Sequence, residues 1–343
     1  MQAVILAAGK STRTYPLTLT RPKPLLKVAN KTILEYNLEA IRHIADEIII
    51  VVGYKKDMLK EFIRKQYPEL KIKFIEQKEQ LGTGHAVSIL KDAIKDRFIM
   101  LMGDNIYSKK DIDEISKHKS AILVKKVKNP ELFGVVTEKN KILTDIIEKP
   151  KKFISDLVSC ALYSFDGEIF NAIKETKKSE RNEYELTDAI KKLSEHSQIY
   201  CVESSSCFQI SYPWDLLSAD QKIRQNKNVI GKNSKISGKI KNSAIGSNCL
   251  INGIVSNSII LDNTMIDKDS LIENSIIGEN VYFSGMAKSA KNAESVINGK
   301  TIFVERLGAV IGDNVKAENV EIKPGCKIWP NQKISGHINH DIE

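Results

Sequence analysis

The order of apolar and polar positions changes character about two thirds of the way along the 343-residue chain. Before that point, short apolar runs alternate with stretches in which apolar residues recur every three or four positions. The runs predict strands at residues 3–6, 47–52, 72–76, 98–102 and 121–124, and the stretches predict helices at 33–44, 57–66 and 84–95. Strands that alternate with helices predict a mostly parallel sheet that is covered on both faces.

Residues 133–148 depart from this alternation. Two strand-like runs, 133–138 and 142–148, flank the polar triplet Lys139-Asn140-Lys141. Two strands around a short polar turn are typical of an antiparallel hairpin. The sheet is therefore predicted to be mixed.

After Gln225 the helical periodicity ends and Ile, Gly, Asn and Ser dominate. Aliphatic residues recur at six-residue steps, for example at Ile254, Ile260 and Ile266, and Ile-Gly-x-Asn occurs four times, from Ile230, Ile245, Ile277 and Ile311. A six-residue period predicts a left-handed parallel β-helix, in which aliphatic side chains stack inward and Gly and Asn form the corners. Residues 283–306 break the period and are expected to form an excursion from this helix.

These patterns divide the chain into an α/β domain at residues 1–225, a β-helix at 229–336 and a polar tail at 337–343. No apolar run approaches the roughly 18 residues that a membrane span needs, and the first strand begins at once, without the basic segment of a secretory signal. The five cysteines are scattered and form no Cys-x-x-Cys pair. We therefore expect a cytoplasmic protein without a disulfide framework or a zinc site.

The chain is basic, with 52 Lys and Arg against 43 Asp and Glu. Residues 228–343 are nearly neutral, so the surplus lies in the first two thirds of the chain. Such a charge suits nucleic acid or a small anionic substrate. No Lys/Arg-rich run is interleaved with aromatic residues, which disfavours a nucleic-acid groove.

The first strand runs into a loop of small and basic residues, Leu6-Ala7-Ala8-Gly9-Lys10-Ser11-Thr12-Arg13, which is followed by Arg21-Pro22-Lys23-Pro24. Backbone N–H groups of such a loop can surround phosphates. It is not a Walker A loop, because Val4 stands where that motif needs glycine, and the dinucleotide fingerprint G-x-G-x-x-G is absent.

Further segments follow in order along the chain. They are Glu79-Gln80-Leu81-Gly82-Thr83-Gly84-His85-Ala86, Met102-Gly103-Asp104, Phe133-Gly134-Val135-Val136, Ile147-Glu148-Lys149-Pro150, Arg181-Asn182-Glu183-Tyr184-Glu185-Leu186-Thr187-Asp188 and Tyr212-Pro213-Trp214-Asp215-Leu216-Leu217. With the loop, they make the chain resemble the sugar-1-phosphate nucleotidylyltransferase family. Many members of that family also carry a hexapeptide β-helix.

The resemblance implies a Rossmann-like nucleotidyltransferase domain that transfers a nucleotidyl group from UTP or dTTP to a sugar 1-phosphate of the glucose or N-acetylglucosamine type. Such chemistry depends on positioning and on neutralised charge. By resemblance, Arg13 and Lys23 stabilise the reacting phosphates. The nucleotide is bound by Leu6, Ala8, Gly9, Ser11, Gln77, Gly82 and Thr83. The sugar phosphate is bound by Gly134, Glu148, Lys149 and Ser159.

The resemblance also implies a Mg²⁺ site with Asp104 as a ligand, since this hard cation prefers carboxylate and phosphate oxygens. Relatives have a second aspartate where this chain has Gln209. Ser11 replaces a loop glycine and Ser159 replaces a sugar-contacting asparagine. These three departures keep open an alternative, a catalytically impaired paralogue that binds nucleotide or sugar nucleotide in a regulatory or assembly role.

A β-helix can also carry an acetyltransferase site that uses histidine as its general base. Residues 197–336 contain no histidine, which disfavours that activity. We instead expect the β-helix to make contacts in a homo-oligomer, with a trimer as the form suggested by analogy with similar coils.

Overall fold

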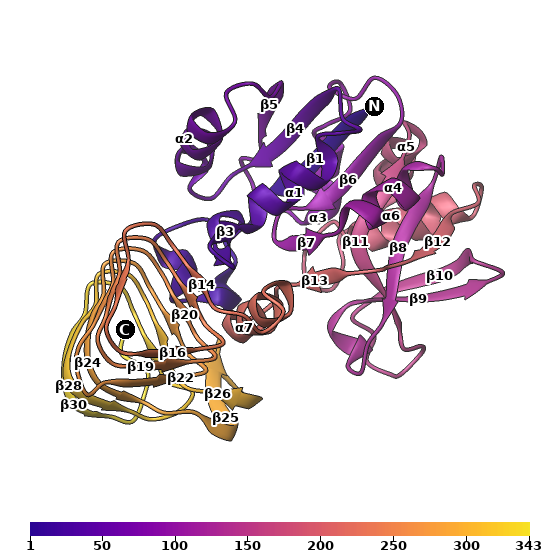
Figure 1. Cartoon of the computed structure of the whole chain (residues 1–343). Helices are drawn as coiled ribbons and strands as arrows, with labels where there is room; N and C mark the ends of the chain where they lie inside the picture. Colours follow the sequence, from indigo (N-terminus) through magenta and orange to yellow (C-terminus); the bar gives the residue numbers. More distant parts are fainter. The chain divides into compact units, whose positions relative to one another are not determined.

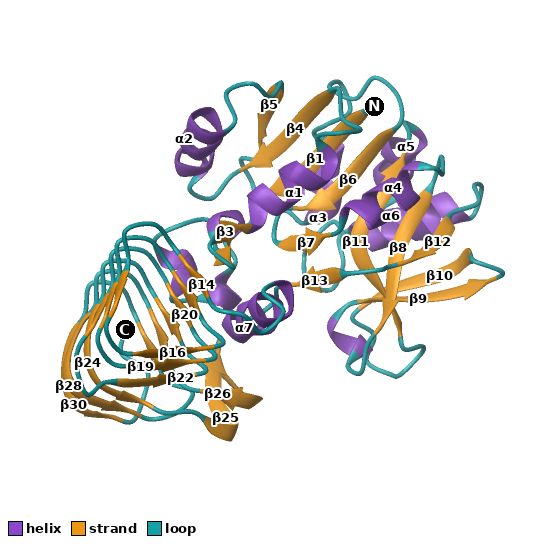
Figure 2. Cartoon of the chain, in the orientation of Figure 1, coloured by secondary structure: helices purple, strands orange, loops and turns teal.

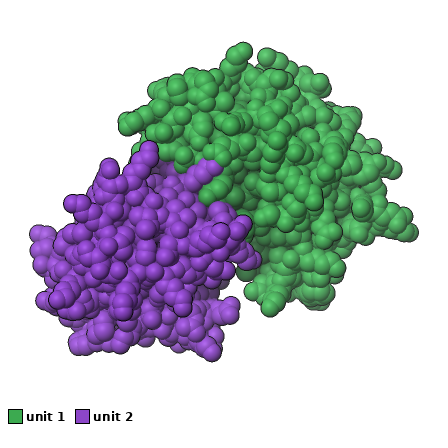
Figure 3. Space-filling view, viewed as in Figure 1, with its two compact units in different colours: residues 1–9, 34–209 green, residues 10–33, 210–343 purple.

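The computed structural model describes residues 1–343 (Figure 1), and they form two compact units. The first unit comprises Met1–Gly9 and Leu34–Gln209, and the second comprises Lys10–Ile33 and Ile210–Glu343; Figure 3 colours them separately. This division differs from the boundary expected at residue 225. The segment Lys10–Ile33 groups with the C-terminal residues because several of its side chains are bonded to corners of the β-helix.

A nine-stranded mixed sheet forms the core of the first unit, with the strand order β5-β4-β1-β6-β11-β8-β12-β10-β9. Its strands are β1 (Gln2–Ala7), β4 (Glu47–Val52), β5 (Ile72–Glu76), β6 (Phe98–Met102), β8 (Ala121–Lys126), β9 (Gly134–Lys139), β10 (Ile142–Glu148), β11 (Leu157–Phe165) and β12 (Tyr200–Glu203). The strands β5, β4, β1 and β6 are parallel, whereas β11 is antiparallel to both β6 and β8. The β9–β10 hairpin confirms the predicted mixed sheet.

The helices of this part of the chain are α1 (Ile33–Ile41), α2 (Lys56–Gln66), α3 (Thr83–Ser88), α4 (Lys109–Ser116), α5 (Glu168–Glu175) and α6 (Leu186–Ser194). Helix α3 is shorter than the helix predicted at 84–95. After Ser88 the backbone closes tighter turns, such as the bonds from the Leu90 amide to the Val87 carbonyl and from the Ala93 amide to the Leu90 carbonyl. Apolar residues at helical spacing continue there without forming an α-helix.

A parallel β-helix makes up most of the second unit, and Figure 2 shows its strands and loops beside α7 (Pro213–Ile223). One six-stranded sheet contains β14 (Val229–Ile230), β17 (Ala244–Ile245), β20 (Ile259–Ile260), β23 (Ile276–Ile277), β27 (Val310–Ile311) and β29 (Lys327–Ile328). The other large sheet contains β15 (Lys235–Ile236), β16 (Lys239–Lys241), β18 (Leu250–Ile251), β19 (Ile254–Ser256), β21 (Met265–Ile266), β22 (Leu271–Glu273), β24 (Tyr282–Ala287), β28 (Lys316–Ile322) and β30 (Lys333–Ile338). The six-residue period thus predicted this architecture.

The interior and the corners of the β-helix follow the sequence repeat. Ile245, Ile260, Ile277, Ile311 and Ile328 pair in register and are fully buried. The asparagines of the corners have left-handed backbone conformations, a region that Asn tolerates better than most residues. Their side chains also hydrogen-bond from coil to coil, at 3.3 Å for Asn233 and Asn248, 3.1 Å for Asn248 and Asn263, 3.1 Å for Asn280 and Asn314, and 3.0 Å for Asn314 and Asn331.

The excursion begins later than predicted. Phe283 is fully buried in the β-helix and Ala287 also faces its core, so β24 continues the coil. The excursion itself is a hairpin of β25 (Ala290–Ile297) and β26 (Lys300–Leu307). The prediction was wrong at its start because a phenylalanine fills an interior position that elsewhere holds an aliphatic residue.

The polar tail predicted at 337–343 starts too early, because β30 continues the β-helix to Ile338. The residues after it are packed against the last coil. The backbone amide of Ile342 donates to the Lys327 carbonyl at 3.0 Å, and the Trp329 amide donates to the Ile342 carbonyl at 2.8 Å. Asp341 also pairs with the buried Lys327 ammonium at 2.6 Å. A buried cation with a carboxylate partner stabilises this contact. None of the helices in either unit combines the length and the apolar character that crossing a membrane requires.

The interior stacking predicts a measurable difference between two isoleucines of the β-helix. Ile277 is fully buried, whereas Ile254 is 47% exposed. The expectation that Ile254 stacks inward was wrong, because its neighbour Val255 takes the interior position of that coil. Ile277→Val should lower the free energy of unfolding by about 0.5–1.5 kcal/mol, because it leaves a methylene-sized gap. Ile254→Val, the matched control, should change it by less than about 0.5 kcal/mol. Urea unfolding followed by circular dichroism checks both, and equal effects would contradict the stacking.

Candidate active site

A pocket of about 180 Å³ opens at the carboxyl end of β1 in the first unit. Its lining residues come from the ends of β1 and β6, from the segment before α3, from α3 itself and from the 181–188 stretch. They are Leu6, Ala8, Gly9, Gln77, Gln80, Gly82, Thr83, Ala86, Met102 and Glu183. Six of the seven residues expected to bind nucleotide are thus brought together around one cavity. The seventh, Ser11, belongs to the second unit.

The side chain of Gln77 is buried and held in one orientation. Its Nε2 donates to the Gly82 carbonyl at 3.2 Å and lies 3.1 Å from Nδ1 of His85. The neighbouring Gln80 donates to the Ala8 carbonyl at 2.9 Å, which ties the pocket wall to the small-residue loop. Fixed amide groups can match the donor and acceptor pattern of a base edge without reorganisation.

Gly82 occupies a position that no other residue would fit. Its φ is +101°, and a Cβ there would lie 2.6 Å from the Tyr184 carbonyl oxygen. The same approach places the Tyr184 amide 2.8 Å from the Leu81 carbonyl, and the Gly84 amide 2.8 Å from the Tyr184 carbonyl. The segment 81–84 is therefore held against the 181–188 stretch by backbone hydrogen bonds.

Asp104 and Gln209 are placed by a short antiparallel pair of strands. The Gly103 amide donates to the Leu6 carbonyl at 2.8 Å, which sets the turn that carries Asp104 beside β1. The following β7 (Asn105–Tyr107) pairs with β13 (Cys207–Gln209), and Gln209 lies opposite Asn105. Asn105, which follows Asp104, therefore faces Gln209 in register.

The Gln209 side chain offers an oxygen donor that the protein does not use. Its Nε2 donates to the Ser159 carbonyl at 3.0 Å, while its Oε1 is buried without a hydrogen-bond partner. An orphaned carbonyl oxygen, on the residue that pairs with the neighbour of Asp104, suits a hard divalent cation, which binds oxygen ligands. Asp104 and Gln209 therefore fit such an ion. No cluster of three or more His, Cys, Asp or Glu side chains completes a cage, so phosphates and water would supply the other ligands.

Three of the four residues expected to bind the sugar phosphate, Gly134, Glu148 and Lys149, lie where β9 and β10 pair. Gly134 lies opposite Glu148, and a Cβ on Gly134 would lie 3.3 Å from Glu148 Oε2 and 3.0 Å from Thr187 Cγ2. Lys149 Nζ lies 3.4 Å from Glu148 Oε1. Ser159 lies on β11, where its hydroxyl is hydrogen-bonded to the Tyr163 hydroxyl at 3.0 Å and accepts from the Ala161 amide at 3.0 Å.

Two residues of the 181–188 stretch join this group, although the sequence reasoning assigned them no role. Arg181 Nη2 lies 2.7 Å from Glu185, 3.5 Å from Glu148 and 3.7 Å from Glu183, so it pairs with three carboxylates. Thr187 Oγ1 is buried without a partner. The resemblance of 181–188 to a family motif was the signal that could have found them, but only the fold shows that they lie beside Glu148 and Gly134.

In the second unit, Ser11 has the left-handed conformation (φ 53°, ψ 53°) that favours glycine. Its carbonyl accepts three hydrogen bonds, from the Thr14 amide at 3.1 Å, the Thr14 hydroxyl at 2.8 Å and the Thr18 hydroxyl at 2.9 Å. Both threonine side chains are fully buried. These contacts hold a serine in a conformation that would otherwise be strained.

Lys23 is 3% exposed and donates from Nζ to the Ile210 carbonyl. Arg13 lies over the Tyr212 ring, 5.7 Å from its centroid. Between these elements, the Asp215 carboxylate accepts from the Ser211 amide at 2.7 Å and the Tyr212 amide at 2.8 Å. Burial raises the pKa of Asp215, and these amides together with the charges of Lys23 and Arg13 oppose that rise. The two cations are thus grouped with the 212–215 segment.

Residues 2–215 match the family model described as nucleotidyl transferase. The chain belongs to this family. It is 38% identical to "Bifunctional protein GlmU" of Methanococcus maripaludis, in an alignment that covers the whole chain and 96% of that protein. It is also 34% identical to "UTP--glucose-1-phosphate uridylyltransferase AglF" of Haloferax volcanii, over 66% of this chain and 97% of that protein.

A solved structure, UDP-glucose pyrophosphorylase complexed with UDP-glucose, shares the fold with a TM-score of 0.59. It is 23% identical and covers 65% of this chain and 98% of that chain. Together with the mixed sheet and the parallel coils, these likenesses confirm the predicted family and the predicted fold class.

Proposed function

We propose that this protein transfers a nucleotidyl group from UTP or dTTP to a sugar 1-phosphate of the glucose or N-acetylglucosamine type, with release of pyrophosphate. The pocket around the fixed amide of Gln77 carries this proposal, because it gathers six of the residues expected to bind nucleotide. The Haloferax volcanii relative, which is named for uridylyl transfer to glucose 1-phosphate, supports it and does not favour the alternative of an impaired paralogue.

Different site residues bind the base, the triphosphate and the sugar phosphate. Gln77 and Gly82 read the pyrimidine edge, Leu6 and Thr83 form the walls of the nucleotide pocket, and Ala8, Gly9 and Ser11 hold the triphosphate through backbone groups. Arg13 stabilises the departing pyrophosphate, and Lys23 stabilises the crowded charge at the reacting phosphates. Gly134, Glu148, Lys149 and Ser159 bind the sugar phosphate. A sugar phosphate oxygen attacks the α-phosphorus, and the bond from that phosphorus to the pyrophosphate oxygen breaks.

We further propose Mg²⁺ as the divalent ion, with Asp104 and Gln209 as its protein ligands. When bound, this ion neutralises charge on the phosphates. Asp104 supplies one negative charge, and Gln209 supplies the buried carbonyl oxygen that has no other partner. The Ser159 carbonyl accepts a hydrogen bond from Gln209 Nε2, so Gln209 Oε1 points away from the Ser159 carbonyl.

A pyrophosphate-release assay with Mg²⁺ tests the function. UTP, dTTP, GTP, ATP and CTP are each combined with glucose, N-acetylglucosamine and mannose 1-phosphate. We expect release with UTP or dTTP and with glucose or N-acetylglucosamine 1-phosphate. Silence across the grid, from protein that still binds nucleotide, would favour the impaired paralogue instead. Preference for a purine would contradict the role of Gln77.

Gln209→Asp should strengthen metal binding, because it adds a negative charge to a site that now has one carboxylate. We expect the Mg²⁺ concentration that gives half-maximal activity to fall by about tenfold, which corresponds to about 1.4 kcal/mol. Titration of activity with Mg²⁺ measures this change. Gln209→Asn shortens the side chain without adding charge and serves as a comparison; if both variants bind Mg²⁺ more weakly, the assignment of Gln209 is wrong.

We also propose that the protein acts in the cytoplasm as a homo-oligomer, with a trimer formed through the β-helix as one form. All five cysteines are free, as in a reducing compartment. The name of the Methanococcus relative says that it is bifunctional. We propose no acetyl transfer for this chain, because residues 197–336 supply no histidine as general base, and His337 on β30 is 76% exposed and pairs with Glu321 at 3.2 Å.

A further inference from the structure

The residues on both sides of Lys23 are bonded to a column of carboxylates on the β-helix. The column consists of Asp262, Glu279 and Asp313, which occupy the same corner of three neighbouring coils. Each lies two residues after an isoleucine, and these isoleucines, Ile260, Ile277 and Ile311, pair in register in the sheet β20-β23-β27. Strands in register stack equivalent positions, so the three carboxylates line one edge of the helix.

Each aspartate of the column holds the coil with one oxygen and the Lys10–Ile33 segment with the other. Asp313 Oδ1 accepts from the Glu279 amide at 2.7 Å, while its Oδ2 accepts from the Thr20 hydroxyl at 2.5 Å and pairs with Arg21. Asp262 Oδ1 accepts from the Ser247 amide at 2.9 Å, while its Oδ2 pairs with Lys27.

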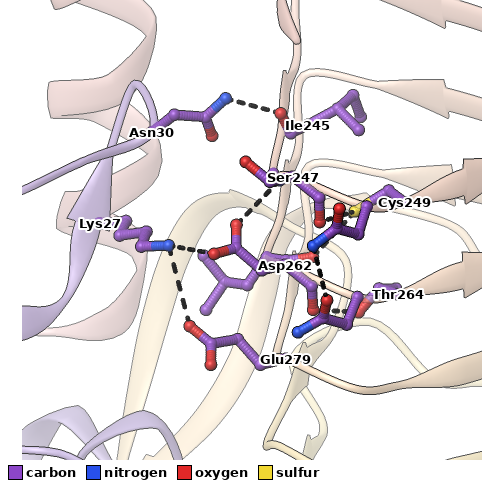
Figure 4. Close-up of polar contacts among 12 residues, drawn as sticks. Lys27, Asn30, Ile245, Ser247, Cys249, Asp262, Thr264 and Glu279 are labelled. Carbon is purple, nitrogen blue, oxygen red and sulfur yellow. Dashed lines mark hydrogen bonds and ion pairs between the residues drawn. The ribbon is translucent and has the colours of Figure 1, made fainter. Parts of the chain in front are cut away.

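Figure 4 shows the Lys27 end of this contact, where the ammonium reaches Asp262 and lies 4.0 Å from Glu279. In the same view, the Asn30 side chain donates to the Ile245 carbonyl at 2.6 Å. The segment is therefore fixed to the β-helix at residues 20, 21, 27 and 30, on both sides of Lys23.

Arg21 makes the strongest of these contacts. It is 9% exposed, and its guanidinium binds Glu279 at 2.5 Å and also binds Asp313. Burial alone lowers the pKa of Arg21, but Glu279 and Asp313 outweigh it and the pKa is raised. Removing a carboxylate from such a site leaves a buried charge without its partner, which is far more costly than the loss of an exposed pair.

The chain between Arg21 and Lys23 is stiff. Pro22 and Pro24 flank Lys23 and fix their own φ angles. The Leu25 amide donates to the Pro22 carbonyl and the Leu26 amide donates to the Lys23 carbonyl, both at 2.9 Å, so a short 3₁₀ turn continues the segment. The fixed φ angles and the turn limit how much rotation within these residues can absorb a shift of Arg21, so such a shift is expected to move Lys23.

We propose that Asp313 and Glu279 are positioning residues for nucleotidyl transfer, because they hold Lys23 in place through Arg21. The inference rests on the proposed function, in which Lys23 stabilises the reacting phosphates. It makes the β-helix a working part of the catalytic machinery, with a role beyond assembly.

Asp313→Asn is the first test, because the amide keeps an oxygen acceptor for Glu279 and removes the charge that faces Arg21. We expect kcat for pyrophosphate release to fall by about tenfold or more, with a smaller change in KM, since misplaced catalytic groups lower the rate steeply. The matched control is Glu318→Gln, on a β-helix carboxylate that is 52% exposed and pairs only with Lys316 among the ion pairs. Wild-type kcat in Asp313→Asn would overturn the inference.

A double variant separates positioning from general damage. If Asp313 acts through Lys23, Lys23→Ala combined with Asp313→Asn should have the kcat of Lys23→Ala alone, because the positioned group is already gone. If the two losses multiply, Asp313 acts by another route and the inference is wrong.

Hydrogen exchange of the Lys10–Ile33 peptides gives a readout that does not depend on turnover. We expect faster exchange of these amides in Asp313→Asn and unchanged exchange in Glu318→Gln. Unchanged exchange in both would overturn the inference. Failure of the wild-type protein to release pyrophosphate would instead contradict the proposed function, so the two failures are distinguishable.

Discussion

Lys23→Ala is expected to lower kcat for pyrophosphate release by about three orders of magnitude, the usual effect of losing a cation at a phosphoryl-transfer centre. Such a loss corresponds to about 4 kcal/mol of transition-state stabilisation. Lys23 is 3% exposed and its ammonium is held by the Ile210 carbonyl. A fixed, desolvated charge of this kind stabilises phosphate charge more effectively than a mobile surface lysine.

The same substitution should leave the fold intact. It removes the hydrogen bond to the Ile210 carbonyl, and such a loss costs about 1–3 kcal/mol when the acceptor is left buried. Thermal unfolding followed by circular dichroism measures that cost. Lys117→Ala is the control, because Lys117 is 60% exposed and pairs with Glu114 on the surface. If Lys23→Ala kept wild-type turnover, the role assigned to Lys23 would be wrong.

Asp104→Asn should also lower kcat/KM by about two orders of magnitude or more, because a carboxylate ligand of the metal becomes neutral. With Gln209 as the other protein ligand, the variant would retain no negative charge among the proposed ligands. The Mg²⁺ concentration for half-maximal activity should rise by more than about tenfold, and high Mg²⁺ should restore part of the activity.

Asp96→Asn provides the matched control for this variant, since Asp96 is exposed and lies outside the proposed site. It should show the wild-type dependence on Mg²⁺. Asparagine preserves the size of the Asp104 side chain, so unfolding measurements should show that the protein remains folded. If Asp104→Asn kept the wild-type Mg²⁺ dependence, Asp104 would not be a metal ligand.

Sequence reasoning located the candidate site where a local rule applied. The pocket residues Gly9 and Gln77 follow strands of the parallel sheet and Met102 ends one, and the carboxyl ends of such strands meet at one edge. The segment-by-segment resemblance then supplied roles for these positions. Neither the strand-end rule nor the family resemblance indicated that the side-chain oxygen of Gln209 is left without a partner. That depends on where the Ser159 carbonyl lies.

The position of Thr187 beside Gly134 could not be predicted from the sequence either. Its place in a family-like stretch was visible, but its distance from Gly134 follows from the packing of α6 against the β9–β10 hairpin. The start of the excursion was wrong for a related reason, because interior volume decided that Phe283 fits among isoleucines.

The sequence by itself determined the alternation of strands and helices, the coiled repeat and the family. Each of these follows from residues that are close together in the chain and repeat with a fixed period. Only the tertiary structure decided that Arg21 would bind Asp313, 292 positions away, and that Lys10–Ile33 would belong to the same unit as the β-helix. Contacts of that kind depend on which coil of the β-helix lies beside which residue of Lys10–Ile33. No local sequence pattern encodes that alignment.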